Sequence, residues 1–157
     1  MPAIYANFDF MLAARQGDCV KLREYLEKKT YSVDTTEFCN VTALQHTAQM
    51  GHMDATRLLL SFGADTKAAS PNGLSSGAHT AKDKAMTAVK YVGEEFKPRW
   101  EAIVQLLDMW DKTTDKDART ALLGDVHRVG RAADDEDEVL VEEDDDDTPQ
   151  FSRGPVN

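Results

Sequence analysis

Side chains that could bind a metal or act as nucleophiles are few in this sequence. It contains two cysteines and four histidines, which are Cys19, Cys39, His46, His52, His79 and His127. A structural metal site needs about four ligands in close pairs such as C-x-x-C, and the chain has no such pair. His46 and His52 are six residues apart, a spacing that does not place them on one face of a helix. We therefore expect no metal site.

Two further patterns could indicate catalysis or nucleotide binding. Cys39, His46 and an aspartate are the residue types of a cysteine hydrolase, but their spacing is unspecific and nothing indicates an oxyanion hole. The segment GLSSG at residues 73–77 lacks the Lys-Ser/Thr ending and the preceding strand of a phosphate-binding loop. The sequence therefore predicts a protein that is not an enzyme and that uses no cofactor.

The most regular segment is TALQHTAQMGHMDATRLLLSFGAD, residues 42–65. Thr42 and Gln45 have the spacing of a capping box, in which the hydroxyl caps an early N–H and the glutamine reaches back to the cap residue. Gly51 is typical of a helix end, and a second apolar pattern follows over about 53–61. We expect two short antiparallel helices joined by a tight turn.

Helices this short bury too little apolar surface to be stable alone, so related copies should be present. In the segment 11–29, the residues that precede Ala48, Gly51 and Leu60 by one constant offset are Ala14, Gly17 and Leu26. A later segment starts at Gly73 and follows the middle copy at nearly the same offset, with Ser75 in place of the capping threonine. The leucine pair 106–107 lies farther from the pair 59–60 than this offset allows. The third copy therefore contains an insertion.

The insertion leads us to expect a long first helix in the third copy, from about Ser76 to Tyr91. A loop and a last helix from about Pro98 to Trp110 should follow, since proline suits the first turn of a helix. A short helix over Asp115 to Leu123 should then cap the end of the stack, because terminal repeats need a polar outer face.

The repeated pattern resembles the ankyrin-repeat family, whose repeat reads roughly G-x-T-P-L-H-x-A-A-x-x-G-H-x-x-x-V-x-x-L-L-x-x-G-A-D. The residues of the middle copy that match it are Thr42, Leu44, Ala48, Gly51, His52, Leu58, Leu59, Gly63, Ala64 and Asp65. The copy departs from the family at Ala43, in place of proline, and at Gln45, in place of histidine. The resemblance implies an all-α fold, a solenoid of stacked helix-turn-helix pairs with finger-like turns between them.

On this basis we divide the chain into three parts. An ankyrin-repeat domain at 1–112 holds repeats at about 8–40, 41–73 and 74–112. A capping helix and linker at 113–133 precede an acidic tail at 134–157. Eleven of the fourteen residues from 134 to 147 are acidic, and such a block of like charge is typical of disorder.

The tail allows two sharper interpretations. It could engage or shield a basic partner of the histone or ribosomal-protein type. Alternatively, Val139, Leu140 and Val141 resemble a SUMO-interacting motif, in which an apolar core adds a strand to a sheet edge.

Charge and composition narrow the function class. Residues 1–133 contain 17 acids and 17 bases, a balance that argues against direct nucleic-acid binding through a basic face. The chain has no signal-peptide pattern and no run of about 20 apolar residues. Two cysteines are too few for a disulfide scaffold. We expect a cytoplasmic or nuclear protein with no membrane contact.

The resemblance also implies where a partner would bind. In the family, contacts come from the fingers and the exposed ends of the first helices. By register these positions are Arg15, Gln16, Phe38, Cys39, Val41, Gln49, Met50, Pro71, Asn72, Leu74, Lys82 and Asp83. Phe38, Val41, Met50 and Leu74 are apolar for residues that face solvent, which indicates either an interface or inward folding.

These observations predict a non-enzymatic protein-interaction module, which is an adaptor, a scaffold or a regulatory subunit. The resemblance implies that it binds a protein partner through the concave surface of the repeats, as a monomer within a complex. The alternative is a chaperone or masking factor that acts on a basic partner through the acidic tail.

Overall fold

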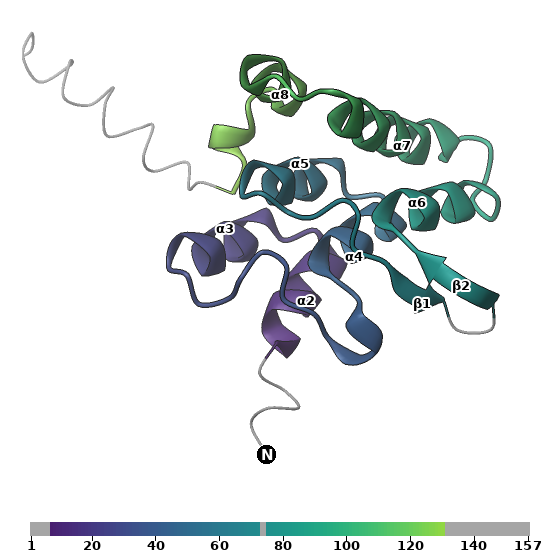
Figure 1. Cartoon of the computed structure of the whole chain (residues 1–157), viewed down its shortest axis with the longest axis horizontal. Coiled ribbons are helices and arrows are strands. Elements are labelled where there is room, and N and C mark those ends of the chain that lie inside the picture. The colour runs from purple at the N-terminus through teal and green to yellow at the C-terminus, as the bar shows by residue number, and fades with distance from the viewer. Residues whose placement is uncertain (1–6, 73–74, 131–157) are drawn as a thin grey trace, which may run out of the picture.

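The structure, a computed structural model, describes residues 7–72 and 75–130 (Figure 1). This part of the chain is mostly helical, as the sequence predicts, and also contains one short hairpin. Its helices and strands are α2 (Phe8–Gln16), α3 (Cys19–Glu27), α4 (Ala43–Met50), α5 (Met53–Ser61), β1 (Ser70–Asn72), β2 (Ser75–His79), α6 (Ala81–Val89), α7 (Lys97–Lys112) and α8 (Lys116–Leu123), with 3-10 turns η1 (Phe38–Asn40) and η2 (Val126–Arg128).

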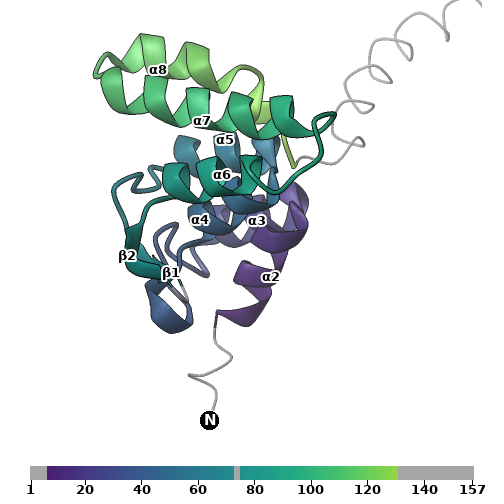
Figure 2. The ribbon, with the colours of Figure 1, turned by 90° about the vertical axis from the view of Figure 1, so that its right-hand side faces the viewer.

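Helices α2 to α7 form three consecutive pairs that stack in two rows. α2 packs against α4 and α4 against α6, while α3 packs against α5 and α5 against α7 (Figures 1 and 2). Small buried side chains at Ala14, Ala48 and Ala85 let the helices of the first row approach closely. The core contains completely buried large apolar side chains, which are Phe10, Met11, Leu22, Leu44, Leu58, Leu59, Leu60, Ile103 and Leu107.

The middle pair forms as its local signals predict, except at Gln45. The Thr42 hydroxyl accepts a hydrogen bond from the backbone N–H of Gln45 at 3.3 Å, and Gly51 ends α4 with a φ of 77°. The Gln45 side chain does not reach back to the cap, so that part of the capping-box prediction is wrong. Its Nε2 donates to Ala68 O at 2.9 Å and its Oε1 accepts from Ser70 Oγ at 2.7 Å. Gln45 is buried, and the loop before β1 and the first residue of β1 satisfy the two ends of its amide.

The third pair begins later than the repeat pattern predicts. The expected helix from Ser76 is wrong, because residues 75–79 form β2, which pairs antiparallel with β1. Thr80 and Asp83 make a full capping box, and α6 starts at Ala81. The repeat pattern places Ser75 at the N-cap of this helix, whereas the observed N-cap is Thr80, five residues later. Five inserted residues therefore lie before α6, and the other inserted residues lie after Thr80.

In each of the first two pairs, a backbone carbonyl near the end of the first helix accepts a hydrogen bond from a side chain of the following pair. The Nε2 of His52 donates to Arg15 O at 2.8 Å, and the Nε1 of Trp100 donates to Gln49 O at 2.9 Å. Arg15 directly follows Ala14 and Gln49 directly follows Ala48, so the two acceptors are equivalent positions of the repeat. Each pair is therefore joined to the next by a side-chain hydrogen bond to the backbone carbonyl at the same position of the repeat.

α8 does not cap the end of the stack, contrary to the sequence prediction. It packs against the backs of α5 and α7, and η2 returns along α5. The guanidinium of Arg23, on α3, then donates to Val126 O and to Val129 O, both at 2.6 Å. Residues 113–130 thus cross the second row of helices, and Met86, on α6, is 48% exposed.

Among the described residues, no helix combines the length and the apolar character that crossing a bilayer would require.

Candidate partner-binding surface

Four of the predicted binding residues lie at the same end of adjacent helices. Arg15 and Gln16 end α2, and Gln49 and Met50 end α4, which packs beside it. Gln16 and Gln49 are exposed, and Met50 is 49% exposed. The structure thus brings these four predicted residues together on one surface.

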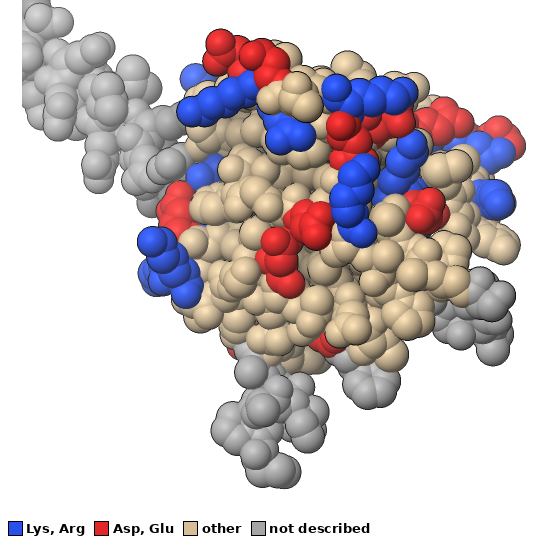
Figure 3. All heavy atoms as spheres, in the orientation of Figure 1, with Lys and Arg blue, Asp and Glu red and all other residues tan. Residues whose placement is uncertain are grey.

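The predicted finger residues have mixed environments. Cys39 and Pro71 are exposed and Val41 is half-buried, so Val41 is in part folded inward. The Phe38 and Asn72 side chains, the whole of Leu74 and the tail motif Val139, Leu140 and Val141 lie outside what the structure describes. In Figure 3 the lower part of the visible face, where the loop before α4 and the hairpin lie, shows few charged side chains. Charged residues gather instead toward α7 and α8.

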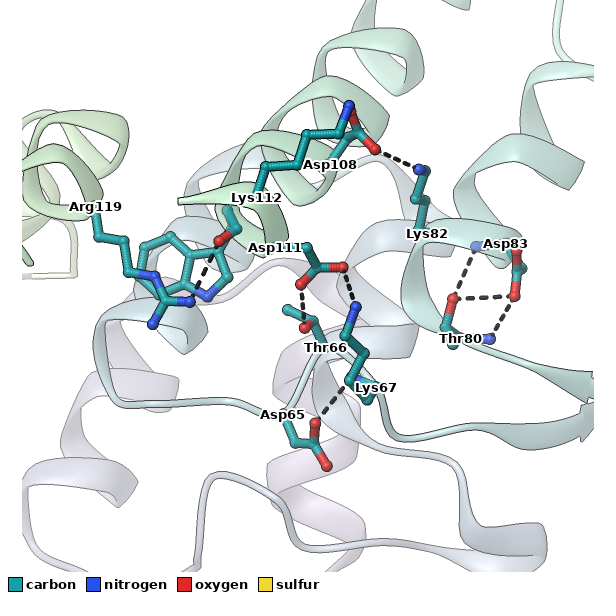
Figure 4. Close-up of polar contacts among 11 residues, drawn as sticks. Asp65, Thr66, Lys67, Thr80, Lys82, Asp83, Asp108, Asp111, Lys112 and Arg119 are labelled. Carbon is teal, nitrogen blue, oxygen red and sulfur yellow. Dashed lines mark hydrogen bonds and ion pairs between the residues drawn. The ribbon is translucent and has the colours of Figure 1, made fainter. Parts of the chain in front are cut away.

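Lys82 and Asp83 do not join the four residues at the ends of α2 and α4. Lys82 points to α7, where its Nζ lies 2.7 Å from Asp108 Oδ1, and Asp83 caps α6 through Thr80 (Figure 4). They belong to the first turn of α6, because the hairpin delays the helix by five residues. Counted from the cap, Thr87 and Ala88 correspond to Gln49 and Met50.

The same part of the structure holds a polar network on the inner side of α7. Hydrogen bonds from Lys112 and Lys82 lower the pKa of Asp108 to about 2. Asp111 accepts from Thr66 and from Lys67, and the guanidinium of Arg119 lies 4.9 Å from the centre of the Trp110 ring (Figure 4). These contacts tie α7 to the loop after α5 and to α8, so they have a structural role.

A polar cluster that the sequence did not indicate joins α2 and α4 to the loop between the first two pairs. Glu37, in that loop, accepts from Arg15 of α2 and from His46 Nε2 of α4, the latter at 2.6 Å. Burial lowers the pKa of His46, and the Arg15 and Lys84 cations act in the same direction, although the hydrogen bond to Glu37 raises it. His46 is therefore neutral at neutral pH and serves as a donor to Glu37.

Lys84, on α6, is a second residue that the sequence analysis did not select. It is only 6% exposed, and burial lowers its pKa. Within the described residues its ammonium has neither a hydrogen bond nor an ion pair. The sequence signal that could have located it is the capping box at Thr80 and Asp83, which sets the start of α6.

The Cys19 thiol and the possible metal ligands are the remaining side chains whose chemistry the structure describes. Burial, with Asp54 and Asp18 adding to it, raises the pKa of the Cys19 thiol to about 11, so the thiol is protonated at neutral pH. No group of three or more His, Cys, Asp or Glu residues in residues 7–72 and 75–130 is placed to hold a metal ion.

Comparisons with protein-family models, with curated proteins and with solved structures found no match to this chain.

Proposed function

We propose that this protein is a non-enzymatic interaction module of the ankyrin-repeat type, an adaptor or scaffold that binds another protein. Its binding surface, called here the first-helix face, consists of the C-terminal ends of α2 and α4 and the loops before α4 and α6. The observation that supports this proposal best is Met50, an apolar side chain that is 49% exposed at the end of α4, next to the exposed Gln49. The resemblance of the middle copy to ankyrin repeats supports the same surface.

The side chains around Met50 have the composition of a small protein interface. Methionine is flexible and apolar, so it adapts to the shape of a partner. Gln16 and Gln49 offer donors and acceptors without the large desolvation cost of a charge. Arg15 and Glu37 form a charged pair at the rim. An apolar centre with a polar rim is the usual anatomy of a recognition surface.

The chain offers a matched pair of methionines for a test. Met50 on α4 is 49% exposed and Met109 on α7 is 50% exposed, but Met109 is on the other row of helices. Full-length chains with Met50→Glu or Met109→Glu would be used to capture partners from cells of the source organism, with quantification against wild type. We expect Met50→Glu to lose partners that Met109→Glu retains.

Two controls complete this test. Thermal unfolding of both variants should match wild type, because each methionine is already half in solvent. Equal partner recovery with Met50→Glu and Met109→Glu would contradict the proposed surface. A chain without residues 134–157 distinguishes the adaptor from the alternative function, a masking factor that acts through its tail. The masking factor would lose its partner without the tail, and an adaptor would keep it.

A further inference from the structure

Lys84 occupies on α6 the position that His46 occupies on α4. Each lies four residues after the threonine that caps its helix, Thr80 for Lys84 and Thr42 for His46. The two helices pack side by side, and the Lys84 charge is close enough to lower the pKa of His46. The two side chains are therefore neighbours in one row across the first helices.

The two positions differ in the carboxylate that serves them. The loop before α4 supplies Glu37 to His46, at 2.6 Å. The chain between Asp65 and Asp83, which includes the hairpin before α6, contains no acidic residue. Asp83 itself is bonded to the cap at Thr80. The hairpin therefore cannot provide Lys84 with the partner that His46 has.

The Lys84 ammonium lies near the surface and has no counter-charge within residues 7–72 and 75–130. The side chain is 6% exposed, so its position is already restricted by packing. Among the described residues, Arg57 Nε is the one side-chain atom that is both sealed from solvent and without a hydrogen-bond partner. The Lys84 ammonium also has no partner among these residues but is not sealed in this way. It therefore still contacts water, and an incoming group could reach it.

We propose that Lys84 is a binding point for a carboxylate, an Asp or Glu side chain presented to the first-helix face. This inference rests on the proposed function and specifies the chemistry of the ligand. A partly dehydrated, ordered ammonium forms a stronger ion pair than a flexible lysine on an open surface, because less water and less side-chain freedom are lost on binding. The carboxylate comes either from a partner protein or from the acidic run 134–147 of the chain itself.

Lys82 provides the matched control, because it is two residues away but pairs with Asp108 of α7. The probe is a labelled peptide with the sequence of residues 134–147, compared with a version in which every acid is the corresponding amide. Its affinity would be measured by fluorescence anisotropy for full-length chains whose own 134–147 acids are changed to Asn and Gln. We expect Lys84→Met to weaken binding about tenfold and Lys82→Met to change it less than about twofold.

A second arm identifies the source of the carboxylate. If the native tail occupies Lys84, the native chain should bind the acidic peptide several-fold more weakly than the chain with a neutral tail. Equal affinity of the two chains assigns the carboxylate to a partner. Equal losses for Lys84→Met and Lys82→Met, or equal binding of the acidic and amide peptides, would overturn the proposal.

The outcomes also separate this inference from the proposed function. If Met50→Glu loses captured partners while Lys84→Met keeps both partners and peptide, only the assignment of Lys84 fails. If Met50→Glu recovers partners as well as Met109→Glu does, the proposed interaction surface fails, whatever the peptide shows.

Discussion

The junction between the first two helix pairs and the junction between the last two are alike at the turn and different on the first-helix face. At the turn, His52 in one junction and Trp100 in the other donate to equivalent backbone carbonyls. On the face, Glu37 links Arg15 to His46 in the first junction, and nothing acidic is available to Lys84 from the hairpin of the second. The comparison indicates that the stacking of the pairs uses the same backbone carbonyl at both junctions. The charged side chains on the first-helix face, in contrast, differ from one junction to the other.

The largest expected effect tests the interior of the stack. Leu59 of α5 is completely buried, so Leu59→Ala should lower the free energy of unfolding by about 2–5 kcal/mol. Leu106, its counterpart on α7, is 6% exposed and belongs to the end pair, so Leu106→Ala should have a smaller effect. Denaturant unfolding measures both. A larger loss for Leu106→Ala would mean that the end pair is the more tightly packed unit.

The next effect tests whether the two turns are equivalent. A Cβ on Gly17 would lie 2.6 Å from His52 Nδ1, and a Cβ on Gly51 would lie 2.7 Å from the Trp100 ring. Both glycines have a positive φ, so alanine adds backbone strain of about 1–2 kcal/mol to the overlap. Gly17→Ala and Gly51→Ala should each destabilise by about 2–4 kcal/mol in thermal unfolding, including the cost of moving the ring.

Gly63 is the matched control for those two variants. Its φ is +87°, but a Cβ there would meet no atom within 4 Å. Gly63→Ala should therefore show the strain alone, about 1–2 kcal/mol. Three equal melting shifts would mean that the rings of His52 and Trp100 move aside freely.

The contrast between the junctions also explains which parts of the fold and of the candidate surface could be predicted from the sequence. The middle pair was predictable to the residue at α5, because apolar spacing, a threonine cap and Gly51 are local signals. The start of α6 was misplaced, because a repeat period carries no information on the length of a hairpin. The site of α8 depends on its contacts with α5, which lies far away in the sequence, as well as on those with the neighbouring α7. Lys84 could not be selected from the sequence, because its role is inferred by comparing its surroundings in space with those of His46, which pairs with Glu37.

A pH effect should distinguish the first junction. Because the pKa of His46 is lower in the folded protein than its ordinary 6.5, the unfolded chain takes up the proton more readily. Stability that is complete above about pH 6.5 should fall as the pH drops from there through the folded pKa. His46→Gln can still donate to Glu37 but does not titrate. Its stability should depend less steeply on pH between 7 and 5 in thermal unfolding, and an unchanged slope would contradict the assignment.

The smallest expected effect concerns the second junction. The side chain of Lys84 is largely buried and has no counter-charge among the described residues, so it adds no stability. Lys84→Met should therefore leave the free energy of unfolding at pH 7 unchanged or raise it by up to about 1 kcal/mol. Lys82→Met should lower it slightly, through loss of the pair with Asp108.

The pH dependence of Lys84→Met sharpens that comparison. The pKa of Lys84 lies below its ordinary 10.5 in the folded protein, so wild type should gain stability as the pH rises through the folded pKa toward 10.5. Any advantage of Lys84→Met should therefore shrink above neutral pH in denaturant unfolding. A clear loss of stability in Lys84→Met at pH 7 would show that the ammonium already has a partner within the chain, and the two junctions would then be electrostatically alike.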